Sequence, residues 1–413
     1  MHSDPQQYLG LGLIGYGGIG RLHAVNYVEL PFLYPGAIPR PELRWVATSR
    51  EESARSAARE SGAAAWTARW RDVLEDPQVR AVDVSLPNHL HREVVLAALD
   101  AGKHVYCEKP LAGTLADAEA IAGAVHPDGP LFAMTFQYRF LPATLRARAL
   151  VESGAIGTVY TFRAEYLHTG YQDPSRPLSW RLRREEGGSG ALGDLGSHVI
   201  DLVRYLVDDI DAVQGHLETF VPERPVAKGA TETGPVTVDD VAWIRARTAG
   251  GAVGTIEASR VATGTLDDLR LWIHGEHGAL HFSLMDPGCL WWYDVNRAGG
   301  DYGGERGWQR LDTVQHYPGA TVPPGRAPIG WIRAHAENQY RFLRAVTMRD
   351  GGRDGDGDGA PAGGEARARA AGDTAGDLAD RALPGIADGL AVQRVLDATE
   401  RSHAAGGLWT PVG

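Results

Sequence analysis

The sequence predicts an α/β N-terminal domain, built as a doubly wound parallel sheet, and an α+β C-terminal domain with a large, mostly antiparallel open sheet. Three observations support this prediction. Short apolar strands alternate with helical segments over the first third of the chain, a glycine-rich turn follows the first strand, and after about residue 155 strands follow one another across short turns. We place the boundary near residue 137, which gives domains over 1–136 and 137–413.

Strand and helix signals alternate regularly in the first domain. The apolar runs predict strands over 8–14, 43–49, 79–86, 104–107 and 130–136. Helical patterns lie between them, over 19–29, 51–61 and 91–101. Gly102 is a stop signal for the last of these helices. Because β-α-β crossovers are right-handed, this alternation predicts a parallel sheet covered by helices on both faces.

The second domain has a different order of predicted elements, with strands that follow one another across short turns. Its β-rich runs predict strands over 159–166, 212–220, 241–248, 252–260, 268–274 and 278–284. Helical patterns lie over 194–206, 331–348 and 385–405. The segment 349–380 interrupts this pattern with Gly, Ala, Asp and Arg, and it has too few large apolar residues to build a core. We therefore predict a mobile insertion there.

The insertion contains the spacing of a calcium loop. Asp354, Asp356, Asp358, Gly359 and Glu365 fit the pattern D-x-D-x-D-G followed by Glu. The small residues around them supply none of the apolar anchoring that such a loop needs. We interpret the match as a chance product of a repetitive Asp-Gly linker.

Composition argues against several classes of function. The 413 residues are 43% hydrophobic and 23% charged, as in a globular protein, and the net charge of −11 disfavours nucleic acid and anionic membranes as partners. With only Cys107 and Cys289, neither a disulfide framework nor a four-cysteine zinc site can form. No apolar run has the length of a membrane span, and the short apolar stretch near the N-terminus lacks a basic leader. We expect a cytoplasmic protein.

The glycine-rich turn predicts a nucleotide site. Gly15, Gly17 and Gly20 form Gly-x-Gly-x-x-Gly between the first strand and the first helix. The first glycine permits the tight turn, the second the approach of a pyrophosphate, and the third close packing of helix on strand. With Gly18 and Ile19, they present the free N–H groups of a helix N-terminus to phosphate. The pattern therefore favours a Rossmann-type site for NAD or NADP over a turn without a ligand.

The end of the second strand bears on the choice between NAD and NADP. An NAD-selective site usually has Asp or Glu here for the ribose hydroxyls, whereas this chain has Ser49 and Arg50. A hydroxyl and a guanidinium suit a 2′-phosphate better. The sequence thus leans to NADP, although Glu51 and Glu52 follow directly, and a solvated Arg50 at a helix start is the alternative.

Three residues carry the chemistry of alcohol oxidation. Lys109 directly follows a strand, at the sheet edge where such folds bind ligands, and it is one of only three lysines. Asp194 and His198 are four residues apart, so on a helix they share one face. An imidazole can exchange protons near neutral pH, and an aspartate can orient it or hold a hydroxyl. A surface lysine, a helix N-cap for Asp194 and a buried structural histidine are the alternatives.

Two longer motifs make the chain resemble the Gfo/Idh/MocA family of NAD(P)-dependent oxidoreductases over nearly its whole length. They are Glu-Lys-Pro at 108–110 and Gly-x-x-Asp-x-Gly-x-His within 187–201. Further matches are Leu-Pro-Asn-His-Leu-His at 86–91, Gln-Tyr-Arg-Phe at 137–140, Gly-Ala-Ile-Gly at 154–157, Ser-Trp-Arg at 179–181 and the strand at 251–258. The insertion is the main departure from the family pattern.

The resemblance implies roles for individual residues. His198 would be the proton acceptor or donor, with Lys109 and Asp194 assisting. Besides the glycine turn, Ser49 and Arg50, the residues implied at the cofactor are Leu86, Asn88, His91, Glu108, Lys109, Gln137, Trp180 and Arg181. The resemblance further implies a homodimer or homotetramer formed through the open sheet. It requires no metal, and no second His or Cys joins Asp194, His198 and Asp201 in a ligand set.

The implied reaction is hydride transfer between a nicotinamide cofactor and a secondary hydroxyl or ketone of a sugar, glycoside or cyclitol. The second motif and the run Pro-Leu-Ser-Trp-Arg at 177–181 look closest to members that act on pyranose-type sugars such as levoglucosan. One alternative is a glycoside-cleaving enzyme that oxidises a ring carbon transiently. Another is a non-catalytic cofactor-binding sensor, which an intact set of Lys109, Asp194 and His198 disfavours.

Overall fold

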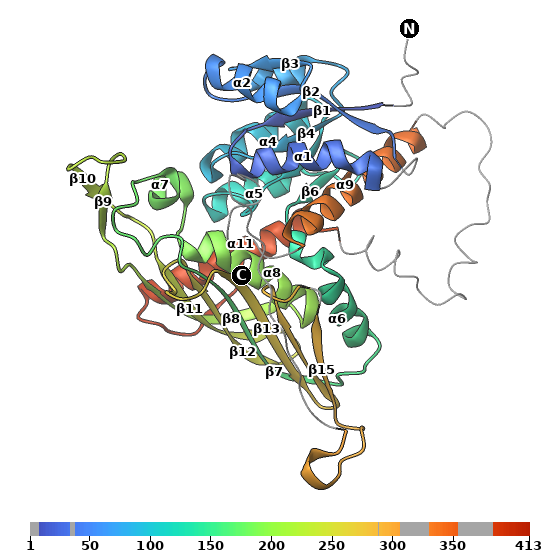
Figure 1. Cartoon of the computed structure of the whole chain (residues 1–413), viewed down its shortest axis with the longest axis vertical. Helices are drawn as coiled ribbons and strands as arrows, with labels where there is room; N and C mark the ends of the chain where they lie inside the picture. The colour runs from blue at the N-terminus through green and yellow to red at the C-terminus, as the bar shows by residue number, and fades with distance from the viewer. Residues whose placement is uncertain (1–7, 34–37, 288, 306–329, 354–382) are drawn as a thin grey trace.

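The computed structural model describes residues 8–33, 38–287, 289–305, 330–353 and 383–413. Its first sheet is parallel, with the strand order β3-β2-β1-β4-β5-β6, and it confirms the predicted doubly wound α/β fold (Figure 1). The strands are β1 (Tyr8–Ile14), β2 (Arg40–Ala47), β3 (Ala65–Thr67), β4 (Ala81–Val84), β5 (His104–Cys107) and β6 (Phe132–Met134).

Helices cross over between these strands. They are α1 (Gly18–Leu33), α2 (Glu51–Ser61), α3 (Trp70–Glu75), α4 (His91–Asp100) and α5 (Leu115–Ala124). The predicted α2 matches residue for residue, whereas β3, α3 and α5 were not predicted. Three predicted strands differ at their ends, among them the 130–136 strand, which shortens to β6. The second begins earlier and ends at Ala47, and the 79–86 strand narrows to β4 because the chain turns at Pro87 into a short 3₁₀ turn.

The second sheet is mixed and mostly antiparallel, in the order β15-β14-β13-β7-β12-β11-β8-β16. All six predicted strands lie in it, and its one parallel pair joins β7 to β12. Its strands are β7 (Val159–His168), β8 (Ile210–Glu218), β11 (Val241–Thr248), β12 (Val253–Ser259), β13 (Asp267–Gly275), β14 (Gly278–Ser283), β15 (Leu290–Asp294) and β16 (Thr410–Pro411). A separate small hairpin pairs β9 (Glu223–Pro225) with β10 (Thr233–Pro235).

Helices of the second half join the two sheets. They are α6 (Pro142–Glu152), α7 (Arg184–Gly187), α8 (Ser197–Leu206), α9 (Trp331–Arg353) and α11 (Ile386–Ala404). Helix α8 packs on β7 and β12, and α9 runs beside α1 of the first domain (Figure 1). Helices α9 and α11 come after residue 137 in the chain, yet they pack on the first sheet. The predicted boundary at residue 137 therefore separates the two sheets in sequence order, whereas the packing of these two helices crosses it.

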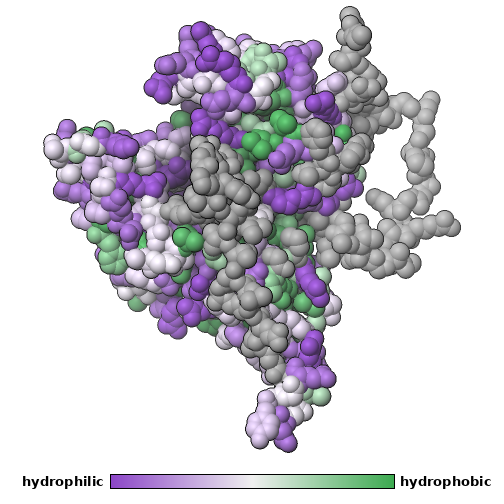
Figure 2. Space-filling model, in the orientation of Figure 1, coloured by the Kyte–Doolittle hydropathy of each residue, from purple (hydrophilic) through white to green (hydrophobic). Residues whose placement is uncertain are grey.

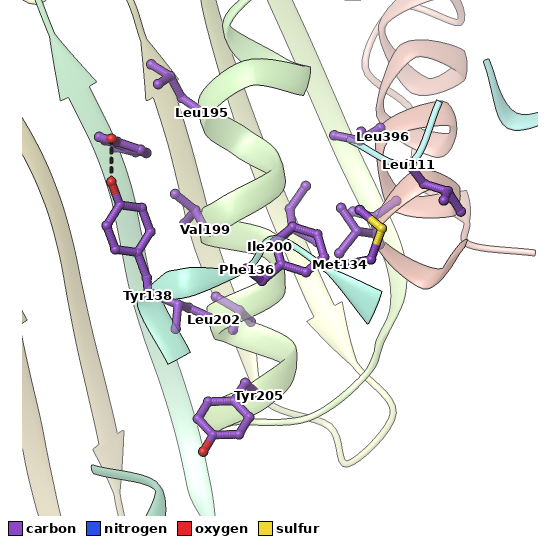
Figure 3. Packing of buried hydrophobic residues seen from close by; sticks show 14 of the residues in the cluster. Leu111, Met134, Phe136, Tyr138, Leu195, Val199, Ile200, Leu202, Tyr205 and Leu396 are labelled. Atoms are coloured by element: carbon purple, nitrogen blue, oxygen red, sulfur yellow. Dashed lines mark hydrogen bonds between the residues drawn. The ribbon is translucent and has the colours of Figure 1, made fainter. Parts of the chain in front are cut away.

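One continuous apolar cluster fills the space between the sheets. It includes Met134 and Phe136 from the first domain together with Leu195, Val199 and Ile200 on and before α8, side chains that Figure 3 shows near one another. Each fully buried side chain of this size contributes about 1.5–3 kcal/mol. The two domains therefore share a core, which fixes the position of α8 relative to the parallel sheet.

The predicted mobile insertion needs one correction. Helix α9 continues to Arg353, so the first five residues of the segment 349–380 are helical. Arg349 donates a hydrogen bond to the carbonyl oxygen of Pro127, which anchors this last turn on the first domain. The rest of the insertion, with the calcium-like pattern, lies outside the described residues.

No helix in the described ranges is long and apolar enough to cross a membrane. Hydrophilic and intermediate residues make up much of the described surface on the face shown in Figure 2. The large apolar side chains are instead concentrated in the shared core, where residues of both sheets contribute.

An ion cluster joins three segments: the turn that contains Arg139, helix α8 and helix α11. The Nε of Arg139 donates to Asp201 on α8 at 2.8 Å, and its Nη2 donates to Asp388 on α11 at 2.9 Å. The guanidinium also lies 5.0 Å from the ring centre of Tyr205. Burial raises the pKa of Asp201 to about 6 even though Arg139 opposes the shift. Arg139 is thus the close cation of the buried Asp201, whereas the half-buried Asp388 also has Arg204 at 3.4 Å.

We expect Arg139→Met to lower the free energy of unfolding by about 3–5 kcal/mol at pH 8, because it leaves the buried carboxylate of Asp201 without its hydrogen-bonded cation. Urea unfolding followed by circular dichroism measures this loss. The loss should be smaller at pH 5, where Asp201 can take up a proton. The control Asp397→Asn breaks an exposed i,i+4 pair with Arg401 and should cost less than about 0.5 kcal/mol. Equal effects of the two substitutions would contradict this role of Arg139.

Candidate active site

The glycine turn has the geometry of a phosphate cradle. Gly15 has a φ of +101°, and a Cβ added there would lie 2.2 Å from the carbonyl oxygen of Ser85. A Cβ on Gly20 would lie 2.2 Å from the oxygen of Gly15, so helix and strand pack too closely for a side chain. Gly17 and Gly18 are exposed, and a Cβ on either would meet open space. These residues fit a dinucleotide, whose pyrophosphate would face the N-terminus of α1 beside Ile19.

Ser49 and Arg50 follow the end of β2, as the ribose-binding position requires. Both are exposed, and neither side chain makes a hydrogen bond or ion pair with the described part of the chain. Arg50 precedes α2, and its carbonyl oxygen accepts the hydroxyl hydrogen bonds of Thr48 and Ser53. The guanidinium is therefore available to a ligand, while the backbone around it is held.

Lys109 and Asp194 meet across the two domains. The Lys109 Nζ donates to the Asp194 Oδ1 at 3.0 Å and to its carbonyl oxygen at 2.7 Å. The second carboxylate oxygen of Asp194 accepts a hydrogen bond of 3.0 Å from Arg260, which directly follows β12 and is 1% exposed. Burial raises the pKa of Asp194, but the charges of Lys109, Arg260 and Arg181 outweigh it and hold that pKa well below the usual value. Asp194 is an anion that orients cations, not a proton donor.

His198 is a neutral base beside this pair. Its ring is 5% exposed and lies edge-on to Tyr138, with ring centres 4.9 Å apart. Burial and then the charge of Lys109 push the pKa of His198 well below its usual value. The hydroxyls of Tyr138 and Tyr166 bond each other at 2.8 Å, the dashed contact of Figure 3, and both rings face His198. An unprotonated imidazole can accept a proton at neutral pH.

The local backbone differs from the predicted helix over 194–206. Residues Leu192–Gly196 form a wide π-helical turn, and α8 begins only at Ser197. Asp239 holds the start of this turn, because its two carboxylate oxygens accept the N–H groups of Gly190 and Leu192, each at 2.7 Å. Asp194 thus lies inside a turn and is not a helix N-cap. The wide turn presents its carboxylate to Lys109.

Other predicted residues line the junction of the two domains. Asn88 donates its amide to the carbonyl oxygen of Gly187 at 2.8 Å. The guanidinium of Arg181 stacks on its neighbour Trp180 at 4.2 Å, in the loop that ends at Gly187. Leu86 is half-buried under the glycine turn, and Gln137 is 2% exposed on the domain boundary. The contact of Asn88 with Gly187 joins the first domain to the second beside the predicted cofactor residues.

Two residues implied at the cofactor have other contacts. His91 is fully buried, and its ring nitrogens face the carbonyl oxygens of Leu86, Pro110 and Leu111 at 3.0–3.3 Å. It supports the loop after Lys109, so a direct cofactor contact does not fit its surroundings. The carboxylate of Glu108 is also directed inward, where it accepts the Lys109 N–H at 3.2 Å. His91 and Glu108 therefore support the chain segment that contains Lys109.

Three residues that position the side chains of the site were not predicted from the sequence. Arg260, Tyr166 and Asp239 come from different strands and loops of the second domain. A charged residue at the end of the 251–258 strand was the one available signal for Arg260. The set Asp194, His198 and Asp201 is not brought together as metal ligands, because Asp201 pairs with Arg139. Another group of three, His23, Glu108 and His335, has ligand atoms within 4.8 Å of one another.

This geometry places the chain among the two-domain, dinucleotide-binding oxidoreductases. Two family models agree: one described as an oxidoreductase family with an NAD-binding Rossmann fold matches residues 9–136, and one described as a GFO/IDH/MocA C-terminal domain matches residues 144–281. The chain belongs to the Gfo/Idh/MocA oxidoreductase family, as its motifs predicted.

Relatives named as sugar dehydrogenases or reductases match about half to two thirds of the chain. Levoglucosan dehydrogenase of Pseudarthrobacter phenanthrenivorans is 41% identical over 288 residues, which cover 67% of this chain and 74% of that protein. The 1,5-anhydro-D-fructose reductase of Ensifer adhaerens is 34% identical over 201 residues, which cover 48% of this chain and 56% of that protein. A solved structure of levoglucosan dehydrogenase in complex with NADH and levoglucosan has a TM-score of 0.81 at 34% identity, covering 98% of this chain and 100% of that one.

Two glycine substitutions separate binding from folding. Gly17→Ala adds a methyl group in open space, so we expect the melting temperature to stay within about 2 °C while NADH binding weakens about tenfold. Gly20→Ala forces the carbonyl of Gly15 to move, so the melting temperature should fall by more than about 4 °C. Thermal unfolding and NADH fluorescence titration measure both. Unchanged NADH affinity in Gly17→Ala would show that the turn does not hold the pyrophosphate.

Proposed function

We propose that this protein transfers a hydride between a nicotinamide cofactor and a secondary hydroxyl or ketone carbon of a pyranose-type sugar or a cyclitol. The observation that carries the proposal is the contact of Lys109 with Asp194 next to a neutral His198. These groups lie at the carboxyl edge of the parallel sheet, where the glycine turn would hold the cofactor. Levoglucosan dehydrogenase, with its structural similarity over the whole chain, supports the pyranose-type substrate.

The side chains divide the work of alcohol oxidation. His198 takes the proton of the substrate hydroxyl, which its neutral state allows. Lys109 hydrogen-bonds the same oxygen and stabilises its developing negative charge. Asp194 keeps Lys109 in place and accepts a hydrogen bond from a neighbouring hydroxyl of the ring. When bound, a nicotinamide cofactor would supply the hydride acceptor for the substrate carbon. Reduction of the ketone uses the same groups in reverse, with His198 returning the proton.

The cofactor proposal follows from the end of β2. NADH in the levoglucosan dehydrogenase complexes supports NAD. Ser49 and Arg50 offer a hydroxyl and a guanidinium that pairs with no residue in the described ranges, where many NAD sites have a carboxylate, which supports binding of a 2′-phosphate. We therefore propose that the site accepts both cofactors, with Arg50 favouring NADP.

The open face of the second sheet supports assembly into a homodimer or homotetramer. A cavity of about 530 Å³ lies on this face, lined among others by Arg163, Trp243, Arg245 and Thr255. Trp243 is 38% exposed there, and covering its ring with a second copy of the chain would remove this apolar surface from water. A cytoplasmic location remains our prediction from the sequence.

The proposal is tested by incubating the purified protein with pyranoses, anhydrosugars and inositols, each with NAD and with NADP. We expect absorbance of the reduced nicotinamide at 340 nm with at least one anhydrosugar or pyranose, and an oxidised sugar in equal amount. Arg50→Ala should raise the KM for NADP about tenfold and leave that for NAD nearly unchanged. Release of an aglycone from glycosides without net cofactor reduction would contradict a dehydrogenase, and cofactor binding without any turnover would contradict an enzyme.

His198 is tested as the proton acceptor. We expect His198→Asn to lower kcat about 10²–10⁴-fold and to leave NADH binding within threefold. In the unsubstituted protein, sugar oxidation should keep its kcat/KM as the pH falls below 6.5, because the pKa of His198 lies well below that of a free histidine. The exposed His126 offers the control His126→Asn, which should keep full activity. A loss of less than tenfold in His198→Asn would contradict the assigned role.

A further inference from the structure

A buried polar cluster joins α1, which begins after the glycine turn, to β4, the end of β5 and α9. It comprises His23 on α1, Asp83 on β4, Glu108 after β5 and His335 on α9. His23 is 0% exposed, Asp83 2%, Glu108 7% and His335 1%. Groups of this kind are costly to bury unless their charges and hydrogen bonds are matched. The mechanism above uses none of their side chains directly.

His23 lies between two carboxylates. Its Nδ1 is 2.9 Å from the Asp83 Oδ2, and its Nε2 is 3.4 Å from the Glu108 Oε1. Asp83 also accepts hydrogen bonds from the hydroxyls of Tyr27 at 2.7 Å and Ser85 at 2.8 Å. Nδ1 hydrogen-bonds Asp83, while Nε2 and the Glu108 Oε1 lie within ion-pair distance without a hydrogen bond. Carboxylates on both sides of the ring favour its charged form, the imidazolium. The cation balances two carboxylates that would otherwise be buried together.

The other groups that face His23 agree with a charged ring. Tyr106 on β5 and His335 on α9 lie with their ring centres 5.5 and 5.6 Å from that of His23. Burial lowers the pKa of His23, but Asp83 and Glu108 outweigh it and raise the pKa to about 10. Burial and the charge of His23 together push the pKa of His335 well below its usual value, so His335 stays neutral. The cluster holds one cation, on His23.

Glu108 connects this cation to the catalytic lysine. One oxygen of its carboxylate faces His23, and the other accepts the backbone N–H of Lys109 at 3.2 Å. The Glu108 N–H in turn donates to the carbonyl oxygen of Val84 at 3.0 Å, which ties the segment to β4. Lys109 then reaches Asp194 with its Nζ. A path of polar contacts thus runs from α1, the helix that starts at the glycine turn, to the reacting groups.

We propose that His23 is a positioning residue for hydride transfer: its imidazolium holds the Glu108 carboxylate, which fixes the backbone of Lys109 so that Nζ meets the substrate oxygen. The inference rests on the proposed function. Misplacing a catalytic group by about 1 Å can lower the rate about 10²-fold. A buried ion pair at Glu108, the residue before Lys109, can therefore affect kcat. His23 also joins this pair to α9, because its carbonyl oxygen accepts the Gln339 amide at 3.3 Å.

The kinetic test uses His23→Gln, which keeps a donor of similar reach and removes the charge. We expect kcat for sugar oxidation to fall about 10- to 100-fold, while the NADH dissociation constant changes less than threefold. The KM for the sugar should change less than threefold, because the substituted side chain does not touch the substrate. A purely structural role would lower the melting temperature and leave kcat unchanged, which would overturn the proposal.

Two further variants keep the test decisive if His23→Gln does not fold. Glu108→Gln has nearly the same shape and removes the charge that His23 holds, so it should lower kcat at least about tenfold with NADH binding preserved. Tyr27→Phe removes a hydrogen bond to Asp83 and leaves the contact of His23 with Glu108, so it is the matched control and should keep kcat within threefold. Full kcat in Glu108→Gln, or an equal loss in Tyr27→Phe, would contradict the proposal.

A readout independent of turnover separates this inference from the proposed function. In ¹⁵N-histidine spectra, both nitrogens of His23 should keep the imidazolium signature at pH 8, and His23→Gln identifies the signal. Elemental analysis of the purified protein should find far less than one equivalent of zinc or another transition metal. A stoichiometric metal would mean that His23, Glu108 and His335 are ligands, and a neutral His23 would remove the cation; either result would overturn the proposal.

Discussion

The ion pair between Lys109 and Asp194 is the contact on which the rest of the site depends. It is the point where the parallel sheet and the second domain bring charged side chains together, at 3.0 Å. Arg260 holds the other oxygen of Asp194, and the neutral imidazole of His198 lies nearby in the next helical turn. Neither domain alone contains both a place for the cofactor and a base for the substrate. The shared apolar core and the Arg139 cluster fix the position of the two domains relative to each other.

Residues of the same type differ in protonation state in this structure because their charged neighbours differ. Asp194 is kept anionic by three cations, whereas Asp201, one turn beyond His198, has its pKa raised by burial against a single close arginine. His198 is neutral because it is buried near Lys109, whereas His23 is a cation because two carboxylates flank it. The neighbours, rather than the residue type, decide which group exchanges protons and which holds its position.

Local patterns predicted much of the fold, and motifs predicted the centre of the site. Strands β1, β5 and β11 and helix α2 match their predicted bounds, because strong apolar periodicity and clear stop signals coincide there. The edge strands β15 and β16 and the π-helical turn before α8 were missed, since pairing and the capping contacts of Asp239 depend on distant residues. For the same reason, the pairing of His23 with Asp83, 60 residues apart, has no local signal, and the contact of Arg260 with Asp194 is indicated only by a charged residue at the end of a predicted strand. His91 shows the reverse error, a motif residue whose neighbours give it a supporting role.

The most direct test of this account is a double-mutant cycle on the pair that joins the domains. Lys109→Met, Asp194→Asn and the double variant are compared by kcat/KM for the sugar, with NADH binding measured in each to confirm an intact Rossmann domain. If the two side chains act as one unit, the double variant is hardly slower than the worse single variant, and the coupling free energy is about 2 kcal/mol or more. Losses that add to within about 0.5 kcal/mol would mean that the two groups act independently, and the account would be wrong.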